Sequence, residues 1–130
     1  MLAALNFGAV GLGLGSGALA ASVATLLFSG ILTVVGVETG ADIGLVVGVV
    51  VGLGSGGWVA GAKARHSHRF HGMVTGLLLA FLVVVIARLG GWPGSVAAVV
   101  WMAGLSIAIS GLAGWLAGRR KTATGADPSR

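Results

Sequence analysis

The sequence predicts an all-α integral membrane protein: a four-helix bundle with both termini in the cytoplasm, packed through rows of Gly, Ala and Ser. Three observations predict this class. The 130 residues are 56% hydrophobic and only 8% charged, whereas soluble domains carry about 25% charged residues. The uncharged residues form four long runs separated by short polar or basic segments. Glycines recur at a spacing of four within these runs, a pattern typical of close helix packing in lipid.

The first uncharged run begins near the N-terminus and is far longer than the about 20 residues that cross a bilayer. It predicts a helix over about residues 7–35 that is either tilted or begins with a half-embedded segment. Because the N-terminus lacks the Lys and Arg residues of a signal peptide, we expect this helix to remain in the mature protein. Glu38 and Asp42 end the run, with Gly36 and Gly40 beside them as predicted turn residues.

Three further runs predict helices over about residues 43–62, 72–88 and 95–118. Each run is too long for a strand of a membrane β-barrel, which crosses the bilayer in about 9–11 residues. The proline in the Gly-rich segment before the last run is well placed at the beginning of a helix. The predicted organisation is a four-helix transmembrane domain over residues 1–121, followed by a flexible polar tail over residues 122–130.

The basic residues predict the orientation, because Lys and Arg accumulate in cytoplasmic segments. Of the eight Lys and Arg residues, only Arg88 lies on the side that carries Glu38 and Asp42. The others lie in the loop after the second helix and in the C-terminal segment, as membrane flanks do. This distribution argues against nucleic-acid binding despite the net charge of +5. Contacts with anionic lipids are expected from Lys63, Arg65, Arg69, Arg119, Arg120 and Lys121.

Small residues at every fourth position let two helix backbones approach closely in lipid. The second predicted helix carries the plainest row, in GLVVGVVVGLGSGG at residues 44–57, and the first and fourth helices carry similar rows. One interpretation is packing within a single bundle; the other is that at least one row faces a second protein chain. The residues predicted for helix packing or for an interface are Gly13, Gly17, Gly44, Gly48, Gly52, Gly56, Gly61, Gly72, Gly76, Ser110, Gly114 and Gly118.

His66, His68 and His71 form the single cluster of potential metal ligands in the sequence. Three Lys or Arg residues crowd the same segment, and no cysteine or nearby carboxylate completes a site. We therefore expect no metal and interpret the segment as a basic loop at the lipid surface. All the histidines lie in this one segment, so no catalytic set and no cofactor site is predicted, and we expect the protein not to be an enzyme.

Proton-coupled transport also finds no support, because such transporters keep a carboxylate within the membrane. The small multidrug transporters are four-helix proteins of about this size that depend on a glutamate in their first helix. No acidic residue lies inside a predicted helix of this chain. The Gly-rich segments that imitate phosphate-binding loops lack the lysine of a P-loop and are interpreted as packing surfaces.

A hairpin motif covers the end of the second helix and the start of the third. The segment GGWVAG at residues 56–61 is followed by the basic loop and then by His71, Gly72, Gly76 and Leu77. This order resembles small four-helix prokaryotic membrane proteins of unknown function that carry GG-x2-AG and HG-x3-G at these places. The resemblance implies a four-helix fold in a prokaryotic plasma membrane and no particular activity.

Taken together, these patterns predict a small non-enzymatic membrane protein, either self-associating or an accessory subunit of a larger membrane complex. The alternative is an oligomeric channel or facilitator for a small solute, with a path lined by glycine backbones and hydroxyl groups. A membrane-shaping protein is a third interpretation, suggested only by the basic loop. The expected partners are membrane lipids and either further copies of the chain or other membrane proteins.

Overall fold

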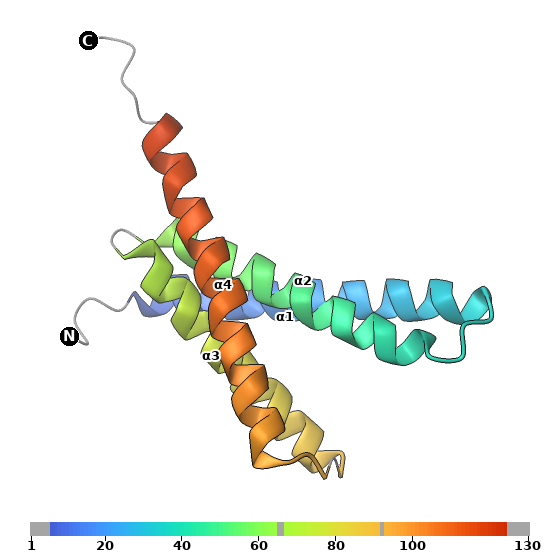
Figure 1. The fold of residues 1–130 in the computed structure, drawn as a ribbon. Helices are drawn as coiled ribbons and strands as arrows, with labels where there is room; N and C mark the ends of the chain where they lie inside the picture. Colours follow the sequence, from blue (N-terminus) through green and yellow to red (C-terminus); the bar gives the residue numbers. More distant parts are fainter. Residues whose placement is uncertain (1–5, 65–66, 92, 125–130) are drawn as a thin grey trace, which may run out of the picture.

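The computed structural model describes residues 6–64, 67–91 and 93–124, and this part of the chain contains four α-helices (Figure 1). They are α1 (Phe7–Val34), α2 (Gly40–Lys63), α3 (His68–Leu89) and α4 (Val96–Thr124). Each helix is long and apolar enough to cross a membrane. The all-α class and the four apolar helices that the sequence predicts are therefore present, as in a multi-pass membrane protein.

α1 begins with a side-chain cap. The Oδ1 of Asn6 accepts a hydrogen bond from the backbone N–H of Ala9 at 3.2 Å, as an N-cap residue does. The helix ends at Val34 and is followed by Gly36, whose φ of +85° suits glycine because it lacks a Cβ. Gly36 therefore acts as the turn residue that the sequence predicts.

α2 begins earlier than predicted, at Gly40 instead of residue 43. Gly40 was expected in the turn, but it is a buried helical residue: a Cβ there would lie 2.8 Å from the Cβ of Leu32 in α1. Because glycine has no side chain, α2 starts directly against the end of α1. Asp42 then lies in the first turn of α2, where a negative charge interacts favourably with the helix dipole.

α3 and α4 are also longer than the uncharged runs. α3 begins at His68, four positions before the predicted start, after Ser67 in a left-handed conformation with φ of +54°. α4 is capped by Ser95, whose Oγ accepts from the N–H of Ala98 at 3.2 Å, so Pro93 lies before the helix and not within it. α4 continues to Thr124, which makes residues 122–124 helical although they were expected in the polar tail.

The helices form two hairpins, α1–α2 and α3–α4, that cross each other instead of lying side by side along their lengths (Figure 1). α2 contacts all three other helices, whereas α1 contacts α3 but not α4 within the described residues. The start of α1, the end of α2, the start of α3 and the end of α4 gather at one end of the molecule. From there the hairpins diverge, so that their turns lie far apart (Figure 1).

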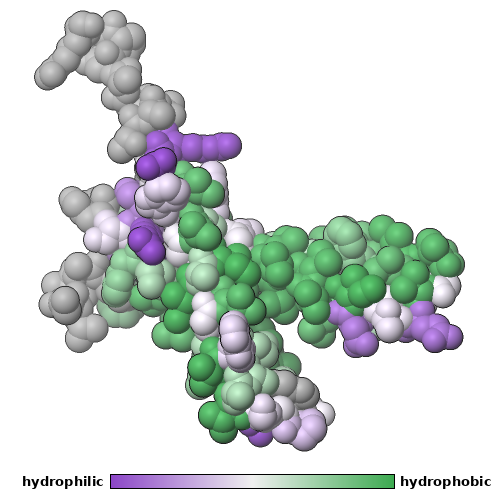
Figure 2. Space-filling view, in the orientation of Figure 1, coloured by the Kyte–Doolittle hydropathy of each residue, from purple (hydrophilic) through white to green (hydrophobic). Residues whose placement is uncertain are grey.

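Large apolar side chains lie outside and small residues lie inside, the reverse of a soluble core. Leu26, Phe81 and Trp101 are among the many exposed hydrophobic residues, and Figure 2 shows an almost continuous hydrophobic surface along the α1–α2 hairpin. The largest fully buried side chains are those of His71, Thr75 and Ser110. Such an arrangement suits a chain whose exterior contacts acyl chains and whose helices pack through small residues.

Candidate functional site

The first helix–helix contact brings the row on α2 against the row on α1. A Cβ at Gly13 would lie 2.7 Å from the carbonyl oxygen of Gly56. A Cβ at Gly17 would lie 2.8 Å from the carbonyl oxygen of Gly52. Any side chain at these positions would overlap the facing backbone. Further along the hairpin, Gly48 lies against Thr25. Gly44 continues the row against Ser29, so the antiparallel pairing extends over most of both helices.

The second contact places α4 in the angle between α2 and α3. Gly61 and Gly72 both approach Gly114, with a Cβ at Gly61 only 2.5 Å from the Cα of Gly114. A Cβ at Gly76 would lie 2.6 Å from both the carbonyl oxygen of Ser106 and the Oγ of Ser110. The predicted packing residues thus lie at helix contacts within one chain, including Gly118, which faces the ring of His68.

Other glycines face open space. A Cβ at any of them would meet no heavy atom of the described residues within 4 Å, and they do not belong to the predicted rows: Gly11, Gly15, Gly30, Gly54 and Gly104. Among the described residues, no contact explains a missing side chain at these positions. They are therefore suitable places to test for contacts with other molecules, because an added Cβ there meets no other part of the described chain.

Two fully buried hydroxyl groups lie where the hairpins meet. The Oγ of Ser110 on α4 donates a 2.8 Å hydrogen bond to the carbonyl oxygen of Leu53 on α2, and Ser110 is fully buried. Thr75 on α3 is fully buried too, and its Oγ1 has no hydrogen-bond partner within the described residues. The Ser110 bond ties the second hairpin to the first, because it joins helices from each of them.

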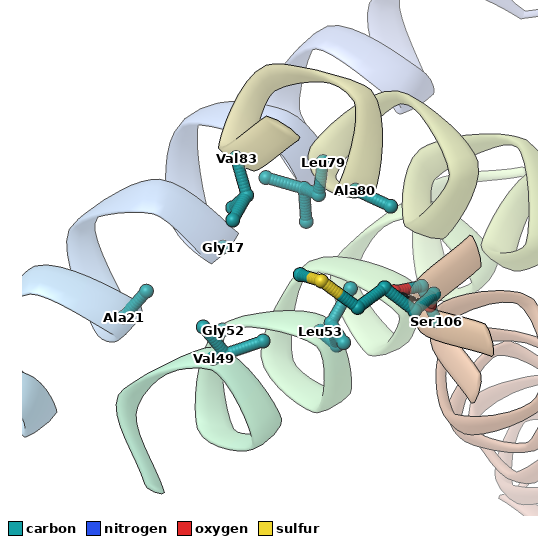
Figure 3. Close-up of a pocket in the computed structure, with 10 residues that line it drawn as sticks. Gly17, Ala21, Val49, Gly52, Leu53, Leu79, Ala80, Val83 and Ser106 are labelled. Carbon is teal, nitrogen blue, oxygen red and sulfur yellow. Dashed lines mark hydrogen bonds between the residues drawn. The ribbon is translucent and has the colours of Figure 1, made fainter. Parts of the chain in front are cut away.

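A small cavity of about 40 Å³ lies at the same crossing (Figure 3). It has room for a few water molecules, at about 10–15 Å³ each, but cavities with apolar walls stay dry. The hydroxyl of Ser106 borders it and donates to the carbonyl oxygen of Met102 in its own helix at 2.7 Å. All four helices contribute to the lining: Gly17, Ala21, Val49, Gly52, Leu53, Leu79, Ala80, Val83, Met102 and Ser106.

The histidines of α3 make contacts between helices that the sequence analysis missed. The Nε2 of His71 accepts a hydrogen bond from the backbone N–H of Asn6 at 3.0 Å, and its Nδ1 lies 3.2 Å from the carbonyl oxygen of Ser67. These partners require an imidazole that is protonated at Nδ1 and accepts at Nε2. His71 is 1% exposed, so the expected position in a loop at the lipid surface is wrong for this residue.

His68 has a similar structural role. Its Nδ1 lies 2.7 Å from the carbonyl oxygen of Gly61, near the end of α2, and its ring packs against Gly118 of α4. A signal for both histidines exists in the sequence: they extend the buried face of α3, which continues through Thr75 and Leu79, by one turn toward the N-terminus. His66 lies outside the described residues. No group of three potential metal ligands occurs in the described part of the chain.

The described members of the predicted lipid-contacting set lie at the end where the helices converge, and hydrophilic side chains are visible there in Figure 2. The guanidinium of Arg119 lies 3.9 Å from the ring centre of Trp115. That of Arg120 lies 5.1 Å from the ring centre of Trp58 on α2. The other residues of this set are Lys63 and Arg69, which are exposed, and Arg65 and the side chain of Lys121, which fall outside the described part.

Between α2 and α4, these two arginines border an open groove of about 340 Å³. Trp58, Leu116, Arg119 and Arg120 line it. The groove therefore combines two positive charges with an apolar floor.

Comparison with known proteins gives no assignment for this arrangement. No family model matches the chain, and no curated protein and no solved structure matches it.

Proposed function

We propose that this chain is a small, non-enzymatic subunit of an integral membrane complex, built with further copies of itself or with other membrane proteins. The observation that carries the proposal is the divergence of the two hairpins (Figure 1). Away from the crossing, each hairpin is an arm of only two helices. The arms expose large apolar side chains, for example Ile31 and Leu45 on one and Phe81 on the other.

A helix of another protein placed between the arms would extend the packing that the crossing begins. It would meet the small and aliphatic residues that already border the cavity, among them Ala21, Val49 and Val83. Close packing against small residues is the main force that associates helices in lipid, where the hydrophobic effect contributes little. A third helix would therefore stabilise each arm more than lipid does.

The proposed location is a prokaryotic plasma membrane, with the converging end and both termini in the cytoplasm. The exposed Lys63, Arg69, Arg119 and Arg120 lie at that end, in agreement with the excess of basic residues on the cytoplasmic side of membrane proteins. At 1.5 Å per residue, the 28 residues of α1 measure about 42 Å, longer than the roughly 30 Å of a hydrocarbon core. If the two hairpins tilt in opposite directions, the membrane can accommodate both the length of α1 and the crossing of the hairpins.

A channel receives less support from the geometry. Hydroxyl groups that could line a path bond to carbonyl oxygens of their own helices: Ser16 to Gly13, Ser22 to Ala18, Ser55 to Gly52 and Ser106 to Met102. The cavity at the crossing is small and apolar. An oligomeric channel stays the alternative, with a path that would have to form between chains.

The proposal is tested by native mass spectrometry of the protein extracted from its own membrane in mild detergent. We expect either a discrete oligomer or a fixed ratio with another membrane protein. Leu substitutions at the open positions Gly15 and Gly104 should leave the monomer stable, so loss of the assembly with either one would locate the interface. A protein that is monomeric and without partners in the wild-type extract contradicts the proposal. Rapid solute flux through liposomes that contain only this chain would favour the channel.

A further inference from the structure

Two histidines of α3 contact neighbouring segments through opposite hydrogen-bond roles. The Nδ1 of His68 lies 2.7 Å from the carbonyl oxygen of Gly61, an acceptor, so this nitrogen must carry a proton to form the bond. The Nε2 of His71 instead accepts from the backbone N–H of Asn6 at 3.0 Å, so it must carry a lone pair. An imidazolium has N–H groups on both nitrogens. A protonated ring can therefore keep the bond of His68 but not that of His71.

Burial makes the acceptor role of His71 sensitive to protonation. The ring is 1% exposed, and its Nδ1 lies 3.2 Å from the carbonyl oxygen of Ser67, so Nδ1 already acts as the donor. A proton on Nε2 would place two N–H groups against each other across the 3.0 Å contact with Asn6. Because the ring is buried, water reaches either group only if the two segments move apart. Protonation of His71 is thus coupled to opening of this contact.

The contact lies at the point where α1 begins. Asn6 holds the first turn of the helix, since its Oδ1 accepts from the N–H of Ala9 and its carbonyl oxygen accepts from the N–H of Val10. Movement of Asn6 therefore disturbs the cap and the turn that follows it. Farther along α1, Gly13 and Gly17 lie against carbonyl oxygens of α2. That packing does not involve His71, so we expect the opening to stay local.

Other charged and titratable groups occur at the same end of the helices. They are Lys63 on α2, His68 and Arg69 on α3, and Arg119 and Arg120 on α4; α1 has none, and Arg65, His66 and Asp127 fall outside the part of the chain that the structure describes. Such charges change the pH at which the ring takes up a proton. They do not change the direction of the response, because the direction follows from the acceptor role of Nε2.

We propose that His71 is a pH-sensitive latch on the start of α1. The latch is closed while the imidazole is neutral, and it opens when the imidazole is protonated. Histidine ordinarily titrates between about pH 5 and 8, so the change falls in a range that cells experience. The closed form binds one proton fewer at His71 than the open form, and acid therefore favours opening. The inference goes beyond the proposed subunit role and holds whether or not the chain assembles with another protein.

The test is amide hydrogen exchange of the detergent-purified protein at about pH 8 and about pH 5.5, corrected for the pH dependence of the intrinsic exchange rate. We expect protection over residues 6–10 to fall about tenfold or more in acid, because a buried hydrogen bond is lost there. Protection around Gly17 should stay the same. A fall of equal size at both places would show general unfolding and overturn the latch.

Two matched variants assign the response to one histidine. His71→Gln supplies an amide oxygen that can accept from the N–H of Asn6 and does not titrate, so protection over residues 6–10 should become independent of pH. His68→Gln removes the neighbouring histidine of the same helix and should leave the response in place. A response that persists in His71→Gln, or that disappears only in His68→Gln, refutes the proposal.

Nitrogen-15 NMR of the imidazole tests the wild type directly, so the result does not depend on whether a variant folds. At about pH 8 the His71 ring should be neutral and protonated at Nδ1. On acidification, its second protonation should coincide with the loss of protection over residues 6–10. A ring that stays neutral while protection falls, or that is protonated while protection persists, would show that His71 does not control the start of α1.

Discussion

The imidazole Nε2 of His71 on α3 accepts a hydrogen bond from the backbone N–H of Asn6, 65 positions earlier in the chain, at 3.0 Å. Asn6 caps α1 through its side chain, so the histidine and the cap together fix the position where the first helix begins. Since α1 and α3 belong to different hairpins, this bond is one of the ties that hold the converging end together. The Ser110–Leu53 bond is another, between α4 and α2.

Replacement of His71 should destabilise the fold. His71→Ala removes a buried ring and leaves the N–H of Asn6 without its acceptor, for which we expect a loss of about 1–3 kcal/mol in the free energy of unfolding. The first turn of α1 should also exchange its amide hydrogens faster. Thermal unfolding in detergent and hydrogen exchange measure the two effects. Phe70→Ala, at the neighbouring half-exposed position, is the control and should have the smaller effect. Wild-type exchange at the start of α1 in the His71→Ala protein would contradict this role.

The close approach of α1 and α2 predicts opposite results for two glycines of the same helix. A Cβ at Gly52 would lie 2.6 Å from the Cβ of Ala21 and 2.7 Å from the carbonyl oxygen of Gly17, whereas a Cβ at Gly54 would meet nothing within 4 Å. Gly52→Ala should therefore lower the free energy of unfolding by about 1–3 kcal/mol. Gly54→Ala should leave it unchanged or raise it slightly, because alanine favours the helix by up to about 1 kcal/mol. Equal stabilities of the two variants in reversible unfolding with SDS would rule out the backbone contact.

The hydrogen bond of Ser110 predicts a difference between two serines of α4. Ser110 donates to α2, but Ser106 donates to a carbonyl oxygen of its own helix. Ser110→Ala should lower the free energy of unfolding by about 0.6 kcal/mol, the average for hydrogen bonds between membrane helices, and by at most about 1.7 kcal/mol, and Ser106→Ala should lower it less. A crosslink between cysteines introduced into α2 and α4 should form more slowly in the Ser110→Ala protein. If both serines behave alike in unfolding and crosslinking, the bond contributes nothing to the contact between hairpins.

The proposed orientation predicts which positions a membrane-impermeant thiol reagent reaches from outside the cell. The chain has no cysteine, so the labelling of a single introduced cysteine can be measured without a background from native thiols. Val35→Cys and Leu89→Cys, exposed at the turns of the two hairpins, should react in intact cells. Ser67→Cys, between α2 and α3, should react only after the cells are opened. If the cysteines of all three variants react from the same side of the membrane, the proposed topology with four membrane crossings is wrong.

The number of helices and their approximate positions could be predicted because they depend on local properties. A long uncharged run in a chain with few charges forms a helix, since its backbone groups have no other partners in lipid. The ends were less accurate: Gly40, His68 and residues 122–124 belong to helices although charges or polarity suggested otherwise. The start of α2, for example, depends on the contact of Gly40 with Leu32, which the local sequence does not reveal.

The candidate site was only partly predictable for the same reason. The sequence identifies Arg119 and Arg120 as basic residues at a membrane flank, but not their cation–π contacts with Trp115 and Trp58. It also identifies His68 and His71 as a cluster, but their contacts with Gly61 and Asn6 form only when three helices meet.

By itself, the sequence determined a chain of four apolar helices with small residues in rows, because run length, charge and spacing act within each helix. Only the tertiary structure decided which row meets which, that the hairpins cross and diverge, and that a groove forms beside Trp58. A glycine permits another helix backbone to approach closely but does not specify which helix that is. The pairing of the rows therefore depends on how all four helices fit together.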